Sequence, residues 1–109
     1  MPFDEILAER LREKLAHRKN VQEKNMFGGL GFLLKGNMLV GIWKEALIVR
    51  LGIEEFEDAL MQPHARKFNI TGKTMRGWVM VDPPGVIEDE QLDYWIQRAW
   101  KFVAKMPAK

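Results

Sequence analysis

The sequence contains no cysteine and no serine, and only two histidines, His17 and His64. The lack of cysteine excludes a disulfide framework, a thiolate nucleophile and a cysteine-ligated zinc or iron–sulfur site. The lack of serine leaves Thr71, Thr74, a lysine or a carboxylate as nucleophiles, and none stands in a recognisable motif. The histidines are too far apart for a zinc-binding helix. We therefore expect a protein that is not an enzyme and that holds no cofactor and no metal.

Long hydrophobic runs and a strong charge excess are also missing. No apolar run approaches the roughly 18 residues of a membrane span, and Asp4 and Glu5 stand where a signal peptide would carry positive charge. We expect a cytoplasmic protein without a membrane partner. The net charge is only +2, so attraction to nucleic acid would require local clustering of cations. A chain of 109 residues, 47% of them hydrophobic, is expected to form one domain over residues 1–109.

Apolar spacing predicts a helix at each end of the chain. The stripe of the first helix, from about residue 4 to 17 with Asp4 as its N-cap, comprises Phe3, Ile6, Leu7, Leu11 and Leu15. The stripe of the closing helix comprises Leu92, Trp95, Ile96, Ala99, Phe102, Val103 and Met106. Both helices are amphipathic, so we expect both to pack against a sheet.

The segment between these helices changes to β-rich stretches at 21–27, 30–34, 38–43 and 46–51. Their short connections exclude parallel crossovers and predict an antiparallel meander. A short helix over 54–61, a basic loop and a strand over 77–81 are expected to follow. The predicted fold class is α+β, with an antiparallel sheet of about five strands flanked by the N-terminal and C-terminal helices.

Two other patterns admit a functional and a structural interpretation. Gly28-Gly29-Leu30-Gly31 is similar to a phosphate-binding loop, but it leads into a strand and not into a helix, which favours a turn or bulge with positive φ. Four acids could in principle hold a hard cation, yet their spacing is not that of a calcium loop, which favours a solvated helix face. They are Glu54, Glu55, Glu57 and Asp58.

A basic segment without acids lies between residues 61 and 81. Its cations could contact phosphates, with Phe68 and Trp78 as stacking surfaces. The alternative, which we favour because four charges are few, is a solvated loop anchored in the core by Phe68. The candidate nucleic-acid contacts are Arg66, Lys67, Lys73 and Arg76, with Arg50 if its strand reaches the same face. The candidate anchors for a protein partner are Trp43, Phe68, Trp78 and Trp100, if they are exposed.

The order of several short motifs resembles the N-terminal domain of TfoX/Sxy-type proteins. Met26-Phe27-Gly28-Gly29 is followed by a strand, a Gly-Asn turn and Met38-Leu39-Val40-Gly41-Ile42-Trp43. Later segments that match the family's order are Ala46-Leu47-Ile48-Val49-Arg50-Leu51, Ala65-Arg66-Lys67-Phe68 and Gly72-Lys73-Thr74-Met75. The resemblance covers nearly the whole chain and implies a curved antiparallel sheet flanked by helices, related to the MmcQ/YjbR fold.

The same resemblance implies a regulatory function, since the best-known members regulate competence for DNA uptake, and it brings no catalytic residues. Those members carry a second, C-terminal domain. We expect no such domain here, because only residues 106–109 follow the predicted closing helix. Our leading hypothesis is a regulatory binding module that recognises a protein partner or a copy of itself. The alternative is nucleic-acid binding through the basic segment. An enzyme ranks lowest, and a deep polar pocket with His64 and a buried carboxylate would favour it.

Overall fold

The computed structural model describes residues 3–26, 28–69 and 72–109. Its α-helices are α1 (Glu5–Leu15), α2 (Ile53–Leu60) and α3 (Asp89–Val103), and a short 3-10 helix, η1 (Pro83–Gly85), precedes α3. Its strands are β1 (Val21–Met26), β2 (Gly29–Leu34), β3 (Asn37–Trp43), β4 (Ala46–Arg50), β5 (Ala65–Lys67) and β6 (Trp78–Val81). The order of helices and strands follows the sequence prediction, with β5 added.

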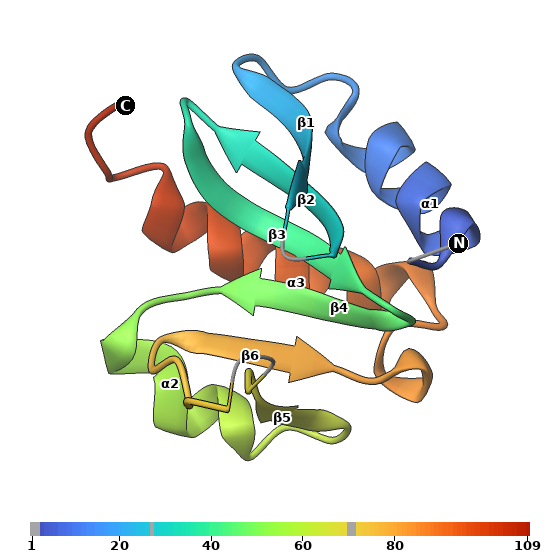
Figure 1. Ribbon diagram of the computed structural model, residues 1–109, viewed down its shortest axis with the longest axis vertical. Coiled ribbons are helices and arrows are strands. Elements are labelled where there is room, and N and C mark those ends of the chain that lie inside the picture. The colour runs from blue at the N-terminus through green and yellow to red at the C-terminus, as the bar shows by residue number, and fades with distance from the viewer. Residues whose placement is uncertain (1–2, 27, 70–71) are drawn as a thin grey trace.

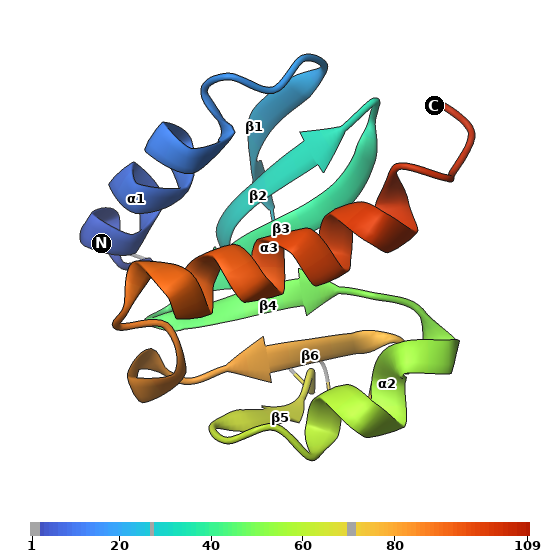
Figure 2. The ribbon, with the colours of Figure 1, turned by 180° about the vertical axis from the view of Figure 1, so that it is seen from behind.

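The strands form one antiparallel sheet in the order β1-β2-β3-β4-β6-β5. The first four make the predicted meander, and α1 and α3 lie across one face of the sheet (Figures 1 and 2). The predicted α+β class is confirmed. The expectation of a loop after α2 was wrong for Ala65–Lys67, because this short segment pairs with β6, whose outer edge would otherwise be unpaired.

Helix α1 begins at the predicted N-cap. The Asp4 carboxylate accepts hydrogen bonds from the backbone N–H groups of Ile6, at 2.9 Å, and Leu7, at 3.2 Å. The predicted apolar stripe was wrong at Ile6, whose exposed fraction is 75%. The helix faces the sheet along Leu7, Leu11 and Leu15, and Ile6 lies about 100° around the helix from Leu7.

Helix α3 buries the predicted stripe against the sheet. Its fully packed residues are Leu92, Trp95, Ile96, Ala99 and Val103, and Phe102 and Met106 are partly buried beside them. This side of the sheet forms the main core together with the buried residues of α1 and α2. None of the helices that the structure describes is long and apolar enough to cross a membrane.

The opposite side of the sheet, which we call the open face, carries a second and smaller apolar cluster. Its buried members are Met38, Ala46, Ile48, Phe68 and Met80, with Met26, Trp43 and Trp78 partly buried around them. The central strands are thus apolar on both sides, as predicted. Residues 72–77, which connect β5 to β6, lie on the open-face side (Figures 1 and 2). This connection places basic residues at the border of the open face.

Candidate nucleic-acid interface

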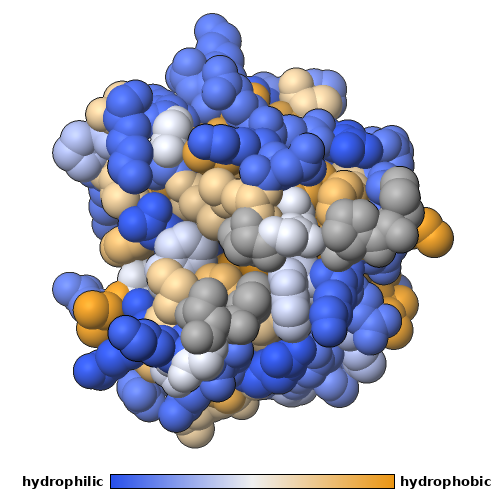
Figure 3. Space-filling model, viewed as in Figure 1, coloured by the Kyte–Doolittle hydropathy of each residue, from blue (hydrophilic) through white to orange (hydrophobic). Residues whose placement is uncertain are grey.

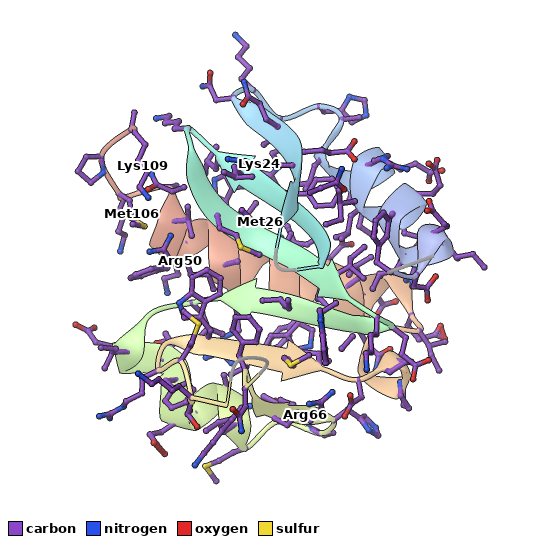
Figure 4. The ribbon with its side chains drawn as sticks, in the orientation of Figure 1. Lys24, Met26, Arg50, Arg66, Met106 and Lys109 are labelled. Carbon is purple, nitrogen blue, oxygen red and sulfur yellow. The ribbon has the colours of Figure 1, made fainter. Side chains whose placement is uncertain are left out.

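The strands carry their charges unevenly. Because successive side chains of a strand point to opposite faces, the pairing register assigns Lys24, Arg50 and Arg66 to the open face. Glu23 is the one carboxylate in the described strands, and it lies on the helix side, where it pairs with Arg12. Figure 4 shows the three cations spread over the open face, from β1 to β5. The charged side chains of the strands on this face are therefore all positive.

Apolar atoms occupy the middle of the open face, with hydrophilic atoms above and below them (Figure 3). The ring of Phe68 is 6% exposed and lies 5.8 Å, centroid to centroid, from the ring of Trp78. Phe68 is thus the core anchor of the connection between β5 and β6, as our favoured interpretation predicted. This contact fixes the connection between β5 and β6 against the sheet.

Each of the four tryptophans has a cation over its ring. The distances from the cationic atom to the ring centroid are 4.6 Å for Lys44 and Trp43, 5.0 Å for Arg50 and Trp78, 5.7 Å for Arg98 and Trp95, and 4.4 Å for Arg18 and Trp100. All of these distances are within the range of a cation–π interaction. Because each ring has a cation over it, the tryptophans offer less free surface for stacking on a nucleobase.

Arg50 differs from the other cations of the open face in its surroundings. It is half-buried, and it lies over the ring of Trp78, its partner across the β4–β6 pair, and 6.0 Å from the ring centroid of Phe102. Burial lowers the pKa of Arg50 from its ordinary value. Within the described residues it forms no ion pair and no side-chain hydrogen bond.

The other predicted cations fall into three groups. Arg66 is exposed and donates two hydrogen bonds from Nε to the Asp82 carboxylate, at 3.0 and 3.1 Å. Lys67 alternates with Arg66 on β5 and therefore points to the opposite side of the sheet, as its partner Val79 does. Lys73 and Arg76 are exposed on the connection that borders the open face. The structure thus places four of the five candidates on or beside the open face, and it directs Lys67 to the other side of the sheet.

The predicted partner anchors do not form one exposed patch. Trp43, Phe68 and Trp78 belong to the open-face cluster, whereas Trp100 packs against the main core from α3. Phe68 is buried and the tryptophans are half-buried. Sequence analysis missed Lys24, which the strand period places opposite Gly31 on the open face.

The glycine-rich segment is a structural feature, as we favoured. Gly28 has φ +78° in the turn before β2, and Gly29 is buried at the start of that strand. A Cβ atom at Gly31 would lie 2.5 Å from Sδ of Met26, so the missing side chain makes room for this methionine. Phe27, the remaining residue of this motif, lies outside the described residues.

The acids of α2 form a solvated helix face, as predicted. Glu55 and Asp58 are exposed and pair with Arg98 of α3, at 2.7 and 3.1 Å. The part of the chain that the structure describes contains no cluster of three or more His, Asp or Glu side chains able to hold a metal ion.

An open pocket of about 350 Å³ lies between the end of α2, η1 and α3. Its lining residues are Gln62, Pro63, His64, Gly85, Glu90, Gln91, Tyr94 and Trp95. His64 and the carboxylate of Glu90 are both exposed. The pocket therefore lacks the buried carboxylate beside His64 that would favour a general base.

Comparison with known proteins assigns the family. No curated protein matches the chain. The model of the TfoX N-terminal domain matches residues 13–103 of the 109 residues, a range that includes the six strands that the structure describes, α2 and the whole of α3, but only the last turn of α1. In a general sense the match supports a small regulatory domain. The sheet, the helices and this match agree with the resemblance seen in the motifs, and the chain belongs to the TfoX N-terminal domain family.

Proposed function

We propose that this domain binds nucleic acid through the open face of its sheet, without catalysis, by contacts between its cations and phosphates. The observation that carries the proposal is the separation of charge in the strands. Lys24, Arg50 and Arg66 occupy the open face, and the one acid of the described strands lies on the other face. Lys73 and Arg76 extend the positive surface along its border.

The expected contacts are mainly with the phosphate backbone. Phosphate contacts give affinity that depends on salt and little on sequence. The tryptophan rings of the open face already have Lys44 and Arg50 over them, which leaves less room for a base to stack. A phosphate-binding domain of this kind would fit the regulatory role in competence that the family resemblance implies.

A protein partner, or a second copy of the chain, is the alternative function. It receives less support, because Phe68 is buried and Trp43, Trp78 and Trp100 are half-buried. Exposed aromatic anchors in one patch would be the usual sign of a protein interface. Among the described residues, the large apolar side chains that are exposed come from separate helices and connections: Ile6, Ile53, Met61, Met75, Ile87 and Tyr94.

Binding of labelled single-stranded and double-stranded DNA at several salt concentrations tests the proposal. Wild-type protein should bind at low salt, and its affinity should fall steeply as salt rises. A triple variant, Lys24→Ala, Lys73→Ala and Arg76→Ala, removes three exposed cations at or beside the open face. For a single strand, the loss of three phosphate contacts lowers the slope of log K against log salt by about 2.

A matched variant controls for the loss of net charge. Lys19→Ala, Lys101→Ala and Lys105→Ala also remove three exposed cations, but Lys19 lies in the connection between α1 and β1, Lys101 lies on α3 and Lys105 follows α3, all outside the strands and the 72–77 segment of the open face. The control should bind nearly as wild-type protein does. Equal loss of affinity in the two triple variants, or no binding by wild-type protein at low salt, would overturn the proposal and direct the search to protein partners.

A further inference from the structure

We propose that Arg50 is the specificity-determining residue of the open face, and that its guanidinium binds one phosphate group of the nucleic acid in a fixed orientation. This inference rests on the proposed function and assigns it a definite site. The other cations of this face would then contribute attraction that depends on charge alone, whereas Arg50 would recognise the shape of the phosphate.

Two aromatic rings hold the Arg50 side chain in place. Trp78 is its neighbour on β6, and its ring centroid lies 5.0 Å from Cζ of Arg50. Phe102 reaches the same guanidinium from α3, at 6.0 Å. Contact with rings from two elements restricts the rotamers of the arginine before any ligand binds. A restricted side chain loses less conformational entropy when it forms hydrogen bonds to a ligand.

Two glycines allow these rings and the backbone of Arg50 to come together. Gly52 has φ +89°, and a Cβ atom at this position would lie 2.6 Å from the ring of Phe102. Gly77 has φ +91°, and a Cβ atom there would lie 3.2 Å from the backbone of Gly52. The carbonyl of Gly77 accepts hydrogen bonds from the N–H groups of Leu51, at 2.9 Å, and Gly52, at 3.0 Å. The backbone after Arg50 is therefore closely packed.

Among the described residues, the guanidinium of Arg50 lacks the carboxylate partner that the other half-buried arginines have. Arg12 pairs with Glu23, and Arg98 pairs with Glu55 and Asp58. Arg50 is half-buried, and among the described residues no carboxylate pairs with it. Partial burial removes water from the cation without replacing it by a protein acceptor. An anionic ligand would supply the missing acceptors.

Phosphate suits this cation because a guanidinium presents a planar fork of N–H donors to two oxygens at once. Two aromatic rings lie near the guanidinium, and among the described residues none accepts a hydrogen bond from its N–H groups, so these donors remain for the ligand. A lysine at this position would keep the charge, but it would lose the fork and part of the ring contact. Replacement of Arg50 by lysine therefore tests the contribution of the guanidinium geometry to phosphate binding while the positive charge is kept.

The experiment compares Arg50→Lys with Arg18→Lys, a matched change at an arginine that also lies over a tryptophan ring, that of Trp100, on the helix side of the sheet and outside the proposed binding surface. Affinity for a fluorescein-labelled single-stranded oligonucleotide is measured by anisotropy over a range of salt. Arg50→Lys should weaken binding by about tenfold, the equivalent of one charge-assisted hydrogen bond, at an unchanged salt slope. Arg18→Lys should change affinity less than about twofold, because Arg18 is exposed on the other side of the sheet and the substitution keeps the charge.

An NMR titration with pyrophosphate separates failure of this inference from failure of the proposed function. The Nε–H signal of Arg50 and the indole signal of Trp78 should shift in wild-type protein, and the Trp78 signal should not shift in Arg50→Lys. Such shifts without any binding of the oligonucleotide would overturn the proposed function and support the phosphate site. Oligonucleotide binding that is equal in the two lysine variants would overturn the Arg50 site and leave the proposed function standing.

Discussion

Substitution of Gly52 by alanine should destabilise the protein through both backbone strain and overpacking. Gly52 has φ +89° and ψ 160°, a region almost restricted to glycine, and an L-residue there costs about 1 to 3 kcal/mol. The added Cβ atom would also lie 2.6 Å from the Phe102 ring, and forced overpacking costs about 1 to 3 kcal/mol. We expect the free energy of unfolding to fall by about 4 kcal/mol.

Urea unfolding measures this change, and Gly72→Ala is the matched control. Gly72 has φ +85°, but nothing lies within 4 Å of the added Cβ position. Its substitution should therefore cost only backbone strain, about 1 to 2 kcal/mol. In a Phe102→Ala background the overlap at Gly52 is removed, and the loss caused by Gly52→Ala should shrink by about 1 to 3 kcal/mol. Equal losses for Gly52→Ala and Gly72→Ala would refute the packing at Phe102.

Four further substitutions test the helix cap, the packing of α1 and the charges of the open face. Asp4→Ala should lower the free energy of unfolding by about 1 kcal/mol in urea, because two N–H groups of α1 lose their acceptor. Leu7→Ala should lower the free energy of unfolding by about 3 kcal/mol, because Leu7 is buried, whereas Ile6→Ala should change it by less than about 0.5 kcal/mol, because Ile6 is exposed. Similar losses of stability in the two variants would contradict the orientation of α1. Asp82→Asn should change the free energy of unfolding by less than about 1 kcal/mol, since the Arg66–Asp82 pair is exposed. The substitution should tighten oligonucleotide binding measured by anisotropy, because it frees Arg66. Weaker binding would count against the open face as the interface.

Local patterns in the sequence were sufficient for most of the fold. The meander followed from alternating β-rich stretches with short turns, and α3 followed from a stripe without a break. The three residues of β5 were missed because a basic segment this short carries no alternation, and only its pairing with β6 makes it a strand. The exposure of Ile6 depends on the direction in which α1 faces the sheet. The residue spacing did not determine whether Ile6 or its neighbour Leu7 faces the core.

The candidate site was only partly predictable, because its geometry depends on contacts between distant segments. The basic segment and the anchoring role of Phe68 followed from composition. The side chains of Arg66 and Lys67 point to opposite faces of the sheet because these residues form a strand, whereas a loop was expected there. The contacts of Arg50 with Trp78 and Phe102 depend on strand register and on the packing of α3, neither of which a local pattern specifies.

The most direct test of the account is to map the surface of isotope-labelled protein that responds to an oligonucleotide in NMR spectra at low salt. We predict the largest shifts at Lys24, Arg50, Trp78 and residues 72–77, on and beside the open face. The outer surfaces of α1 and α3 should be nearly unaffected. Largest shifts on those helix surfaces, with the open face unchanged, would contradict nucleic-acid binding through this sheet.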